Sequence, residues 1–140
     1  MYKLIALDMD GTLLRGDGTI SERTKSAIQQ ARQKGVKVVL ASGRPIEGLE
    51  RYLTELGLTT DDDYALSYNG ALIKNVGTRE NICSQLISGK DLHDVYAVSQ
   101  QIGVNTHAFS TELGLISPKL SHYTAHERDI NGIPLTLIDF

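Results

Sequence analysis

The chain has 140 residues, of which 41% are hydrophobic and 22% charged, and its formal net charge is -3 at pH 7. This length and this balance are typical of an ordinary globular protein and exclude a disordered or fibrous one. The small acidic excess disfavours a general nucleic-acid surface or anionic-membrane surface, because both need a basic excess.

Three short buried strands are predicted in the first half of the chain, at residues 3–7, 36–41 and 64–68. The runs are mainly apolar, and the second is rich in β-branched residues. Strands that are apolar on both faces are typical of a parallel sheet, which is covered on both sides.

Two helices are predicted between these strands. The first begins after Ser21, whose side chain can cap it, and ends before Gly35. The second begins near Pro45, carries apolar residues at helical spacing and ends before Gly57. A tight-turn signal at residues 15–18 predicts a small hairpin before the first helix. The alternation of strands and helices predicts an α/β fold with right-handed crossovers.

The pattern changes after Gly70. The polar stretch at 75–78 predicts the turn of an antiparallel hairpin. The elements predicted in this region are hairpin strands at 71–74 and 81–87, a helix at 90–102, strands at 104–109 and 113–116, and a helix near 122–128. This second stretch is typical of the start of an α+β module and not of more of the same sheet.

Cysteine use and the N-terminal sequence predict a cytoplasmic protein. Cys83 is the only cysteine and cannot form an internal disulfide, which fits a reducing compartment. No charged motif surrounds it, so a structural role is expected. The first apolar run ends in charge at Asp8 and is too short for a signal peptide core or a membrane span. No membrane and no nucleic acid are expected as partners.

The most informative stretch is Asp8-Met9-Asp10-Gly11-Thr12, directly after the first predicted strand. Ligands of open parallel sheets bind at the carboxyl ends of the strands, so both carboxylates are expected to project into a site. Gly11 lets the backbone turn sharply and approach a ligand closely. Thr12 adds a hydroxyl and an amide that can bind phosphate oxygens.

A divalent cation explains why two carboxylates would hold a phosphate. At about 4 Å, two like charges repel by roughly 4 kcal/mol at an effective dielectric constant of about 20. Mg²⁺ reverses that sign, and it prefers one or two carboxylates together with phosphate oxygens and water. One carboxylate can then attack phosphorus, while the other protonates the leaving oxygen and later activates water.

The sequence from Asp8 to Leu14 resembles the first motif of the haloacid dehalogenase superfamily of phosphatases. In that family the first aspartate is the nucleophile, and the aspartate two residues later is the general acid/base. The resemblance implies these roles for Asp8 and Asp10. It also implies that both residues hold Mg²⁺, with the main-chain carbonyl of Asp10 as an additional ligand.

Residues 38–45 resemble the second motif of the family, a strand that ends in Ser or Thr. The resemblance implies that Ser42 donates a hydrogen bond to the transferring phosphoryl group. Free amides at this strand-to-helix turn, including that of Gly43, would add to an anion site. Arg44 could pair with phosphate or hold the loop.

The Ser-Gly-Arg-Pro sequence at 42–45, followed by Tyr-Asn-Gly-Ala at 68–71, resembles the Cof-type sugar phosphatases, whose lid follows the third strand. Asn69 and Gly70 would lie where the chain leaves the core, and the resemblance implies that they contact the substrate. As a pair they are also a common turn signal. The implied domains are a partial Rossmann-like core at 1–73 and the beginning of an α+β lid at 74–140.

Two further family motifs are expected after the lid: a lysine that neutralises phosphate and an acidic Gly-Asp-x-x-x-Asp turn that holds the metal. Neither is found in residues 74–140, where Lys90 and Lys119 do not follow a returning core strand. The chain is therefore expected to be truncated within the lid. Its first strand would then present an unpaired apolar edge, which predicts self-association, strand swapping or a partial fold.

Other candidate sites are weaker. An EF-hand calcium loop is excluded, because Gly11 comes too early and follows a strand. His122 and His126 have helical spacing but lack further zinc ligands nearby, and residues 61–63 are expected to form a solvated loop.

Two functions remain open from the sequence. The first is magnesium-dependent hydrolysis of small phosphorylated metabolites, such as sugar phosphates, through a phospho-aspartate. The second is a catalytically inactive relative that binds phosphate or metal at most. A protein-binding module is a third possibility, for which the sequence offers no positive feature.

Overall fold

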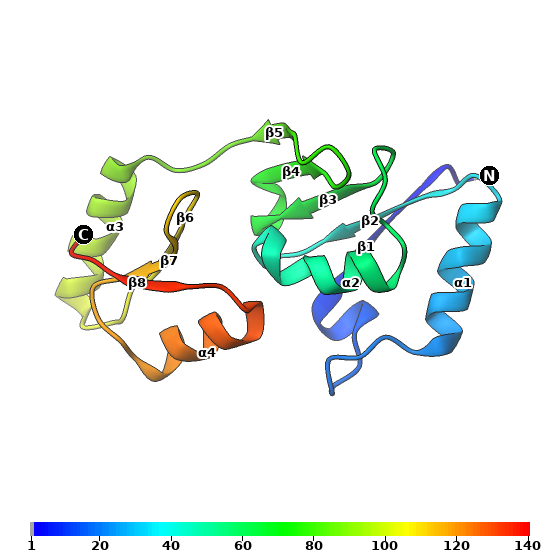
Figure 1. Cartoon of the computed structure of the whole chain (residues 1–140). Helices are drawn as coiled ribbons and strands as arrows, with labels where there is room; N and C mark the ends of the chain where they lie inside the picture. The colour runs from blue at the N-terminus through cyan, green and yellow to red at the C-terminus, as the bar shows by residue number, and fades with distance from the viewer. Residues whose placement is uncertain (1) are drawn as a thin grey trace. The chain divides into compact units, whose positions relative to one another are not determined.

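The computed structural model describes residues 2–140, which form two compact units (Figure 1). The first unit extends to Gln85 and the second comprises Leu86–Phe140. The first contains a five-stranded sheet in the order β1-β2-β3-β4-β5, and the second a three-stranded sheet in the order β6-β7-β8. Within residues 2–140, no helix has the length and apolar character that crossing a membrane requires.

The sheet of the first unit begins with parallel strands, as predicted. β1 (Leu4–Asp8) pairs with β2 (Lys37–Ala41), and β2 pairs with β3 (Tyr64–Ser67). β4 (Leu72–Asn75) and β5 (Asn81–Ser84) add the predicted antiparallel hairpin to β3. The predicted α/β class and parallel sheet are confirmed.

Helices connect the parallel strands. α1 (Glu22–Gln33) begins where expected, because Ser21 Oγ accepts a hydrogen bond from the Thr24 amide at 3.0 Å. The chain leaves it through Gly35, whose φ of +78° favours glycine. After β2, a single helical turn leads into α2 (Glu50–Glu55), so the second predicted helix is present in two parts.

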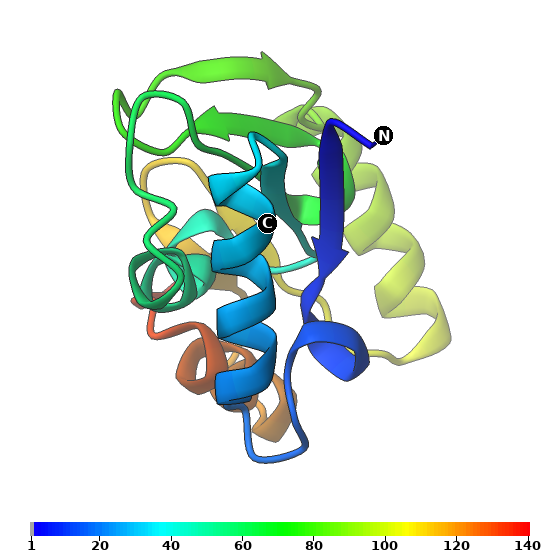
Figure 2. The same ribbon diagram turned by 90° about the vertical axis from the view of Figure 1, so that its right-hand side faces the viewer.

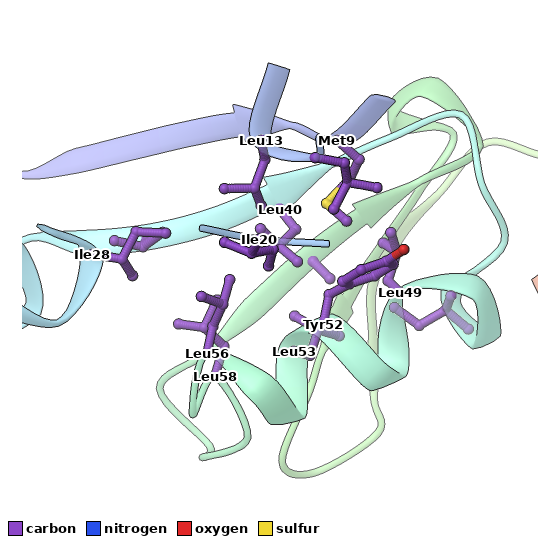
Figure 3. Packing of buried hydrophobic residues seen from close by; sticks show 14 residues of the cluster. Met9, Leu13, Ile20, Ile28, Leu40, Leu49, Tyr52, Leu53, Leu56 and Leu58 are labelled. Atoms are coloured by element: carbon purple, nitrogen blue, oxygen red, sulfur yellow. The ribbon is translucent and has the colours of Figure 1, made fainter. Parts of the chain in front are cut away.

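α1 and α2 lie alongside the sheet (Figure 2), and they contribute to one hydrophobic core with it (Figure 3). Figure 3 shows Tyr52 and Leu53 of α2 beside Leu40 of β2, and all three side chains are buried. Burying one such side chain contributes about 1.5–3 kcal/mol, so this cluster is the main stabilising feature of the unit. Its members are Met9, Leu13, Leu14, Ile20, Ile28, Val38, Leu40, Ile46, Leu49, Tyr52, Leu53, Leu56, Leu58 and Ala65.

β1 lies at the edge of its sheet. Within residues 2–140 it pairs with β2 alone, and its other edge has no strand beside it. The prediction that this first strand is buried is wrong, because Leu4 is 55% exposed and Ile5 38% exposed at this edge. The expectation of an unpaired apolar edge on the first strand therefore holds, and such an edge can pair with another chain.

The segment between β1 and α1 differs from the prediction. Met9–Leu13 form a wide turn, closed by a hydrogen bond from the Leu14 amide to the Met9 carbonyl at 2.9 Å, and its backbone is not helical at Asp10 and Gly11. A tight turn follows, in which the Arg15 amide donates to the Thr19 carbonyl at 2.9 Å. No strands flank this turn, so the predicted hairpin is wrong. The reason is that Leu13, Leu14 and Ile20, which flank this turn, bury their side chains in the core instead of pairing as strands.

The second unit contains two helices and a small sheet. Its elements are α3 (Gly89–Ile102), β6 (Ala108–Ser110), β7 (Gly114–Ser117), α4 (His122–Asn131) and β8 (Leu135–Leu137). β6 pairs antiparallel with β7, and β8 pairs parallel with β7. The sequence did not predict β8, because three residues after Pro134 are too short to show a period.

α3 begins with a capping box. The Asp91 amide donates to Ser88 Oγ at 3.2 Å, and the Ser88 amide donates to Asp91 Oδ2 at 2.8 Å. Gly103 ends the helix in a left-handed conformation, with φ of +72°. Local sequence is therefore sufficient to define both ends of this helix.

The structural boundary between the units falls after Gln85. β4 pairs along its whole length with β3, which places the hairpin in the first unit. The sequence-based division into a core at 1–73 and a lid at 74–140 describes domains of the family and remains a prediction.

Two expectations about single residues are wrong. Asp63 was expected in a solvated loop, but it is only 5% exposed, accepts a hydrogen bond from the Thr60 amide at 2.9 Å and pairs with Arg32 at 3.3 Å. It closes its own loop and ties that loop to α1. Cys83 was expected to be structural, but its side chain is exposed on β5, where it packs into no core.

Candidate active site

Three strand ends meet at one edge of the first unit's sheet. Asp8, the last residue of β1, pairs with Ala41 of β2, and Ala41 pairs with Leu66 of β3. Because these strands are parallel, their carboxyl ends lie at the same edge, where ligands of open α/β sheets bind. The predicted site residues lie at the end of β1 and in the loops that follow the three strands.

The loop after β1 buries its apolar residues and exposes its polar ones. Met9 is fully buried and Leu13 nearly so, whereas Asp8 and residues 10–12 are exposed. Gly11 has a φ of +78°, and no atom lies within 4 Å of the position that a Cβ would take. Neither predicted carboxylate is buried against apolar neighbours, so both are accessible to a ligand.

Arg44 forms a bidentate ion pair with Asp10. Its Nε lies 2.9 Å from Asp10 Oδ2, and its Nη2 lies 2.6 Å from Asp10 Oδ1. Hydrogen bonds from the guanidinium hold the pKa of Asp10 below its usual value, against the opposing effect of partial burial. Arg44 was predicted to contact phosphate or hold the loop; in this structure it binds the carboxylate that was predicted to be the acid/base.

Main-chain hydrogen bonds join the loops that follow β2 and β3. The Asn69 amide donates to the Ser42 carbonyl at 2.9 Å, and the Tyr68 amide donates to the Arg44 carbonyl at 3.1 Å. Ser42 is buried, and its Oγ accepts a hydrogen bond from the Arg44 amide at 3.2 Å. The residues predicted in the second and third loops are therefore brought together and held by their own backbones.

A left-handed turn ends β3 and approaches the second loop closely. Tyr68, Asn69 and Gly70 have φ values of +51°, +56° and +90°. A non-glycine residue in this region costs about 1–2 kcal/mol, and such strain is often found at functional sites. A Cβ on Gly43 would lie 3.1 Å from Asn69 Oδ1, so the glycine permits the two loops to touch. Gly70 is exposed at the same turn.

The sequence did not predict Tyr52 as part of the site. Its buried ring has the Arg44 guanidinium 5.9 Å and the Arg51 guanidinium 4.3 Å from the centroid. Its hydroxyl donates to the Gly18 carbonyl at 3.1 Å. Tyr52 thus links the loop after β1 to the arginine that holds Asp10. Helical spacing signals that Tyr52 is buried, but nothing local signals the two arginines.

Tyr68 adds a neutral hydroxyl near the loop after β2. Burial, together with the carboxylate of Glu47, raises the pKa of Tyr68 to about 12. The hydroxyl therefore stays protonated at neutral pH and can donate a hydrogen bond. Sequence patterns gave no indication of this electrostatic effect of Glu47 on Tyr68, because the two residues lie in different turns, one before α2 and the other after β3.

The donor chemistry of this edge fits Mg²⁺. Asp8 and Asp10 supply exposed oxygens, and Mg²⁺ takes one or two carboxylates and completes its shell with water and phosphate. Among residues 2–140, no three or more His, Cys, Asp or Glu side chains converge into a metal-binding group. The arrangement therefore fits a hard cation held by few protein ligands, and not a tetrahedral zinc cage.

Comparison with known proteins gives one family for most of the chain. The model of the haloacid dehalogenase-like hydrolases matches residues 5–134. The chain belongs to this family. It is 40% identical over 136 residues to YxeH of Bacillus subtilis (strain 168), which carries a provisional phosphatase name; the match covers 96% of this chain and 50% of YxeH. The chain spans about half the length of the curated relatives it matches.

Solved structures of this family share the fold. A haloacid dehalogenase-like hydrolase from Bacteroides thetaiotaomicron superimposes with a TM-score of 0.84 at 26% identity, covering 100% of this chain and 53% of that one. A sugar phosphatase of subclass IIB superimposes with a TM-score of 0.75 at 24% identity, covering 96% and 52%, which shows the shared fold alone. The predicted membership of the haloacid dehalogenase superfamily is confirmed.

Proposed function

We propose that this chain carries the nucleophile of a magnesium-dependent phosphatase that hydrolyses small phosphate esters. Asp8 would be the nucleophile and Asp10 the general acid/base. Sugar phosphates are the proposed substrate class, supported by the sugar-phosphatase name of one solved neighbour and by the Cof-type sequences at 42–45 and 68–71. The chain spans about half the length of its relatives. The proposal therefore concerns the activity of this site, whether the chain acts alone or together with further protein.

One observation carries the proposal. Two exposed carboxylates lie at the end of β1, at the same sheet edge as the Ser42 hydroxyl and the Arg44 guanidinium. Exposed acidic groups and groups that can bind an anion are thus combined at one edge, although the Arg44–Asp10 pair also ties two loops together. This combination suits a reaction in which a carboxylate attacks an anionic phosphoryl group.

Groups from three loops would hold the phosphoryl oxygens. Thr12 offers a hydroxyl, and the lack of a side chain at Gly11 leaves open space in which a ligand can approach the backbone closely. Ser42 can donate its hydroxyl proton while its oxygen accepts from the chain, and the amide of Gly43 lies at the turn before the next helical segment. The turn at 69–70 would face the remainder of the substrate.

The two chemical steps exchange one proton with Asp10. First, an Asp8 oxygen attacks phosphorus, the bond from phosphorus to the ester oxygen breaks, and Asp10 protonates the leaving oxygen. This step leaves a phospho-aspartate at Asp8. Asp10 then takes a proton from water, whose oxygen attacks phosphorus and releases inorganic phosphate. Asp8 is restored and Asp10 is again protonated.

The carboxylates of Asp8 and Asp10 would hold Mg²⁺, and the main-chain carbonyl of Asp10 would be an additional ligand. When bound, it offsets the repulsion between the carboxylates and the phosphoryl oxygens. Chelation with EDTA should abolish turnover, and added Mg²⁺ should restore it. Turnover that survives chelation would contradict the proposed role of the metal.

The deciding experiment is hydrolysis of p-nitrophenyl phosphate by the purified chain, with and without Mg²⁺. Asp8→Asn should abolish turnover, and Asp10→Asn should lower kcat roughly 10²–10⁴-fold, the usual range for a general acid/base. Asp62→Asn is the matched control, because Asp62 is an exposed carboxylate that precedes β3 and pairs with Lys37, away from the site. Equal turnover by the Asp8 variant and the unmodified chain would refute the assignment.

A chain that binds without turnover is the second candidate. It is favoured by the absence, within residues 2–140, of a third acidic side chain grouped with Asp8 and Asp10. In that case calorimetry would detect phosphate binding in the presence of Mg²⁺, while the phosphatase assay would show none above background. Asp8→Asn would then change the metal dependence of binding and nothing in the assay.

The proposed molecular setting is a reducing compartment such as the cytoplasm, and a self-associated state. The first is supported by the single cysteine of the chain. The second is supported by the open edge of β1, where Leu4 and Ile5 are exposed. Size-exclusion chromatography that finds a stable monomer at all concentrations would count against self-association through β1.

A further inference from the structure

The ion pair between Arg44 and Asp10 engages both oxygens of the proposed acid/base. The two contacts measure 2.6 Å and 2.9 Å, and they come from two nitrogens of one planar guanidinium. Bidentate pairs of this kind are among the strongest hydrogen-bonded contacts in proteins. A carboxylate held in this way is badly placed to protonate a leaving group, because both of its oxygens accept hydrogen bonds from a cation.

The arginine is the better anchored of the two partners. Its side chain is 13% exposed and that of Asp10 is 59% exposed. The Arg44 amide donates to Ser42 Oγ, its carbonyl accepts from the Tyr68 amide, and its guanidinium lies 5.9 Å from the ring centroid of Tyr52. The Arg44 backbone is thus fixed by two hydrogen bonds and its guanidinium lies near a buried ring, so Asp10 is the partner with more room to move.

Arg44 is also adjacent in sequence to the residues that are proposed to bind the phosphoryl group. Arg44 follows Ser42 and Gly43 directly in the loop after β2, and the Ser42 hydroxyl already accepts a hydrogen bond from the Arg44 main chain. A guanidinium recognises phosphate with the same fork of N–H donors that it uses for a carboxylate. A phosphoryl group bound at Ser42 would therefore compete with Asp10 for Arg44.

We propose that Arg44 is a positioning residue that exchanges partners: it holds Asp10 before substrate binds and transfers to the phosphoryl oxygens when substrate arrives, which releases Asp10 for proton transfer. This inference rests on the proposed phosphatase function and adds an order of events to it. The exchange replaces one charge-assisted pair with another. The released Asp10 carboxylate then takes up the solvent proton that it delivers to the leaving oxygen, and after turnover it returns one proton to solvent as it pairs with Arg44 again. The consequence of the exchange is that Asp10 becomes available only when a phosphate is present, which restricts proton transfer to the occupied site.

The test is the affinity for inorganic phosphate, measured by calorimetry at constant Mg²⁺ and ionic strength. Four forms of the chain are compared: the unmodified protein, Asp10→Asn, Arg44→Gln and the double variant. Asp10→Asn removes a negative charge, which favours any nearby anion, and it also removes one proposed Mg²⁺ ligand, which disfavours phosphate; this combined effect should be the same with or without the arginine. Partner exchange adds a second effect, which occurs only when Arg44 is present.

The expected result is that Asp10→Asn strengthens phosphate binding about ten-fold more in the presence of Arg44 than in the Arg44→Gln background, the size of one hydrogen bond to a charged group. Arg44→Gln alone should weaken binding. If Asp10→Asn changes the affinity by the same factor, or by a smaller factor, when Arg44 is present, partner exchange is overturned.

A second measurement covers the case in which Arg44→Gln fails to fold, because that side chain is largely buried. The Nε–H resonance of Arg44 in the unmodified protein should shift on titration with phosphate and stay in place with chloride at equal ionic strength. Its shift should be smaller in Asp10→Asn, where no carboxylate is exchanged. A resonance that phosphate leaves unchanged would overturn the proposal even without the variants.

The two levels of inference fail in different ways. If no form of the chain binds phosphate, including Asp10→Asn, the proposed phosphate site fails and partner exchange fails with it. If phosphate binds and Ser42→Ala weakens it while Asp10 and Arg44 act independently, the phosphatase site stands and only the exchange is refuted. Correlated effects of Asp10 and Arg44 on binding support both.

Discussion

The two units of the chain differ in how completely they bury their apolar residues. In the first unit, Leu40 is fully buried in a cluster that joins the sheet to both helices (Figure 3). Among the residues that the structure describes in the second unit, the buried hydrophobic side chains are Leu115, Ile116 and Ile133. Meanwhile α3 leaves Val98 54% exposed. One unit therefore has a closed core, and the other has a small sheet with open flanks.

This difference teaches where a precise site can be built. The candidate site lies in the first unit, on loops whose ends are fixed by paired strands of one sheet and by a packed helix, and such supports hold side chains more precisely than isolated loops do. The second unit has few buried apolar side chains, which is typical of regions that open locally at low free-energy cost. We expect the first unit to determine global stability and the second to unfold first.

The largest expected effect is on the core of the first unit. Leu40→Ala should lower the free energy of unfolding by about 2–5 kcal/mol, because it leaves a cavity beneath the sheet. Val98→Ala, its counterpart on the exposed face of α3, should change it by about 0.5 kcal/mol or less. Urea unfolding followed by circular dichroism measures both. Similar losses for the two variants would show that α3 is covered in solution and would break the comparison.

The next effect concerns the small sheet of the second unit. Gly114 and Gly132 have φ values of +73° and +63°, and a Cβ on Gly114 would lie 2.8 Å from the Pro134 carbonyl oxygen. No atom lies within 4 Å of the Cβ position at Gly132. Gly132→Ala should cost about 1–2 kcal/mol from backbone strain alone. Gly114→Ala should cost clearly more, because it also separates β7 from β8.

Hydrogen exchange of the β7 amides reports the separation of those strands. Protection should fall in Gly114→Ala and persist in Gly132→Ala, whose position offers space for a methyl group. If the two variants are equally unstable, strain is the whole effect and β8 contributes little to the second unit.

A smaller effect is expected at the helix N-termini. Ser21→Ala and Ser88→Ala each remove a cap that accepts a main-chain hydrogen bond, a change that typically costs about 1 kcal/mol. The losses should appear in different places. α1 is packed against the core through Ile28 and should keep its helical exchange protection, whereas α3 should fray because little tertiary packing supports it. Equal fraying of both helices would contradict the contrast between the units.

The smallest expected effect is a change in folding stability that appears only at alkaline pH. The pKa of Tyr68 is raised from 10.0 to about 12, mainly by burial, so the folded chain holds this proton more tightly than the unfolded chain does. The associated stability is fully present below pH 10 and is lost as pH rises through about 12. Tyr68→Phe should lack this loss. Urea unfolding at several alkaline pH values, compared between the two proteins, isolates it from other titrations.

Much of the fold could be predicted from local patterns. The parallel strands appear as apolar runs, Ser21 marks the start of α1, and Gly35 marks its end. The hairpin of β4 and β5 and the helix α3 were also predicted. These features depend on residues close in sequence, so composition and spacing are sufficient to show them. β8 was missed because it is a strand only by virtue of pairing with β7.

The chain by itself determined which chemistry is present at the site: two carboxylates after the first strand, a serine hydroxyl after the next strand and a turn after the third. Only the tertiary structure decided which of these groups touch. Arg44 holds Asp10, Tyr52 lies against Arg44, and Asp63 closes a loop onto α1 through Arg32. Such contacts depend on distances across the fold, and no spacing along the chain encodes them.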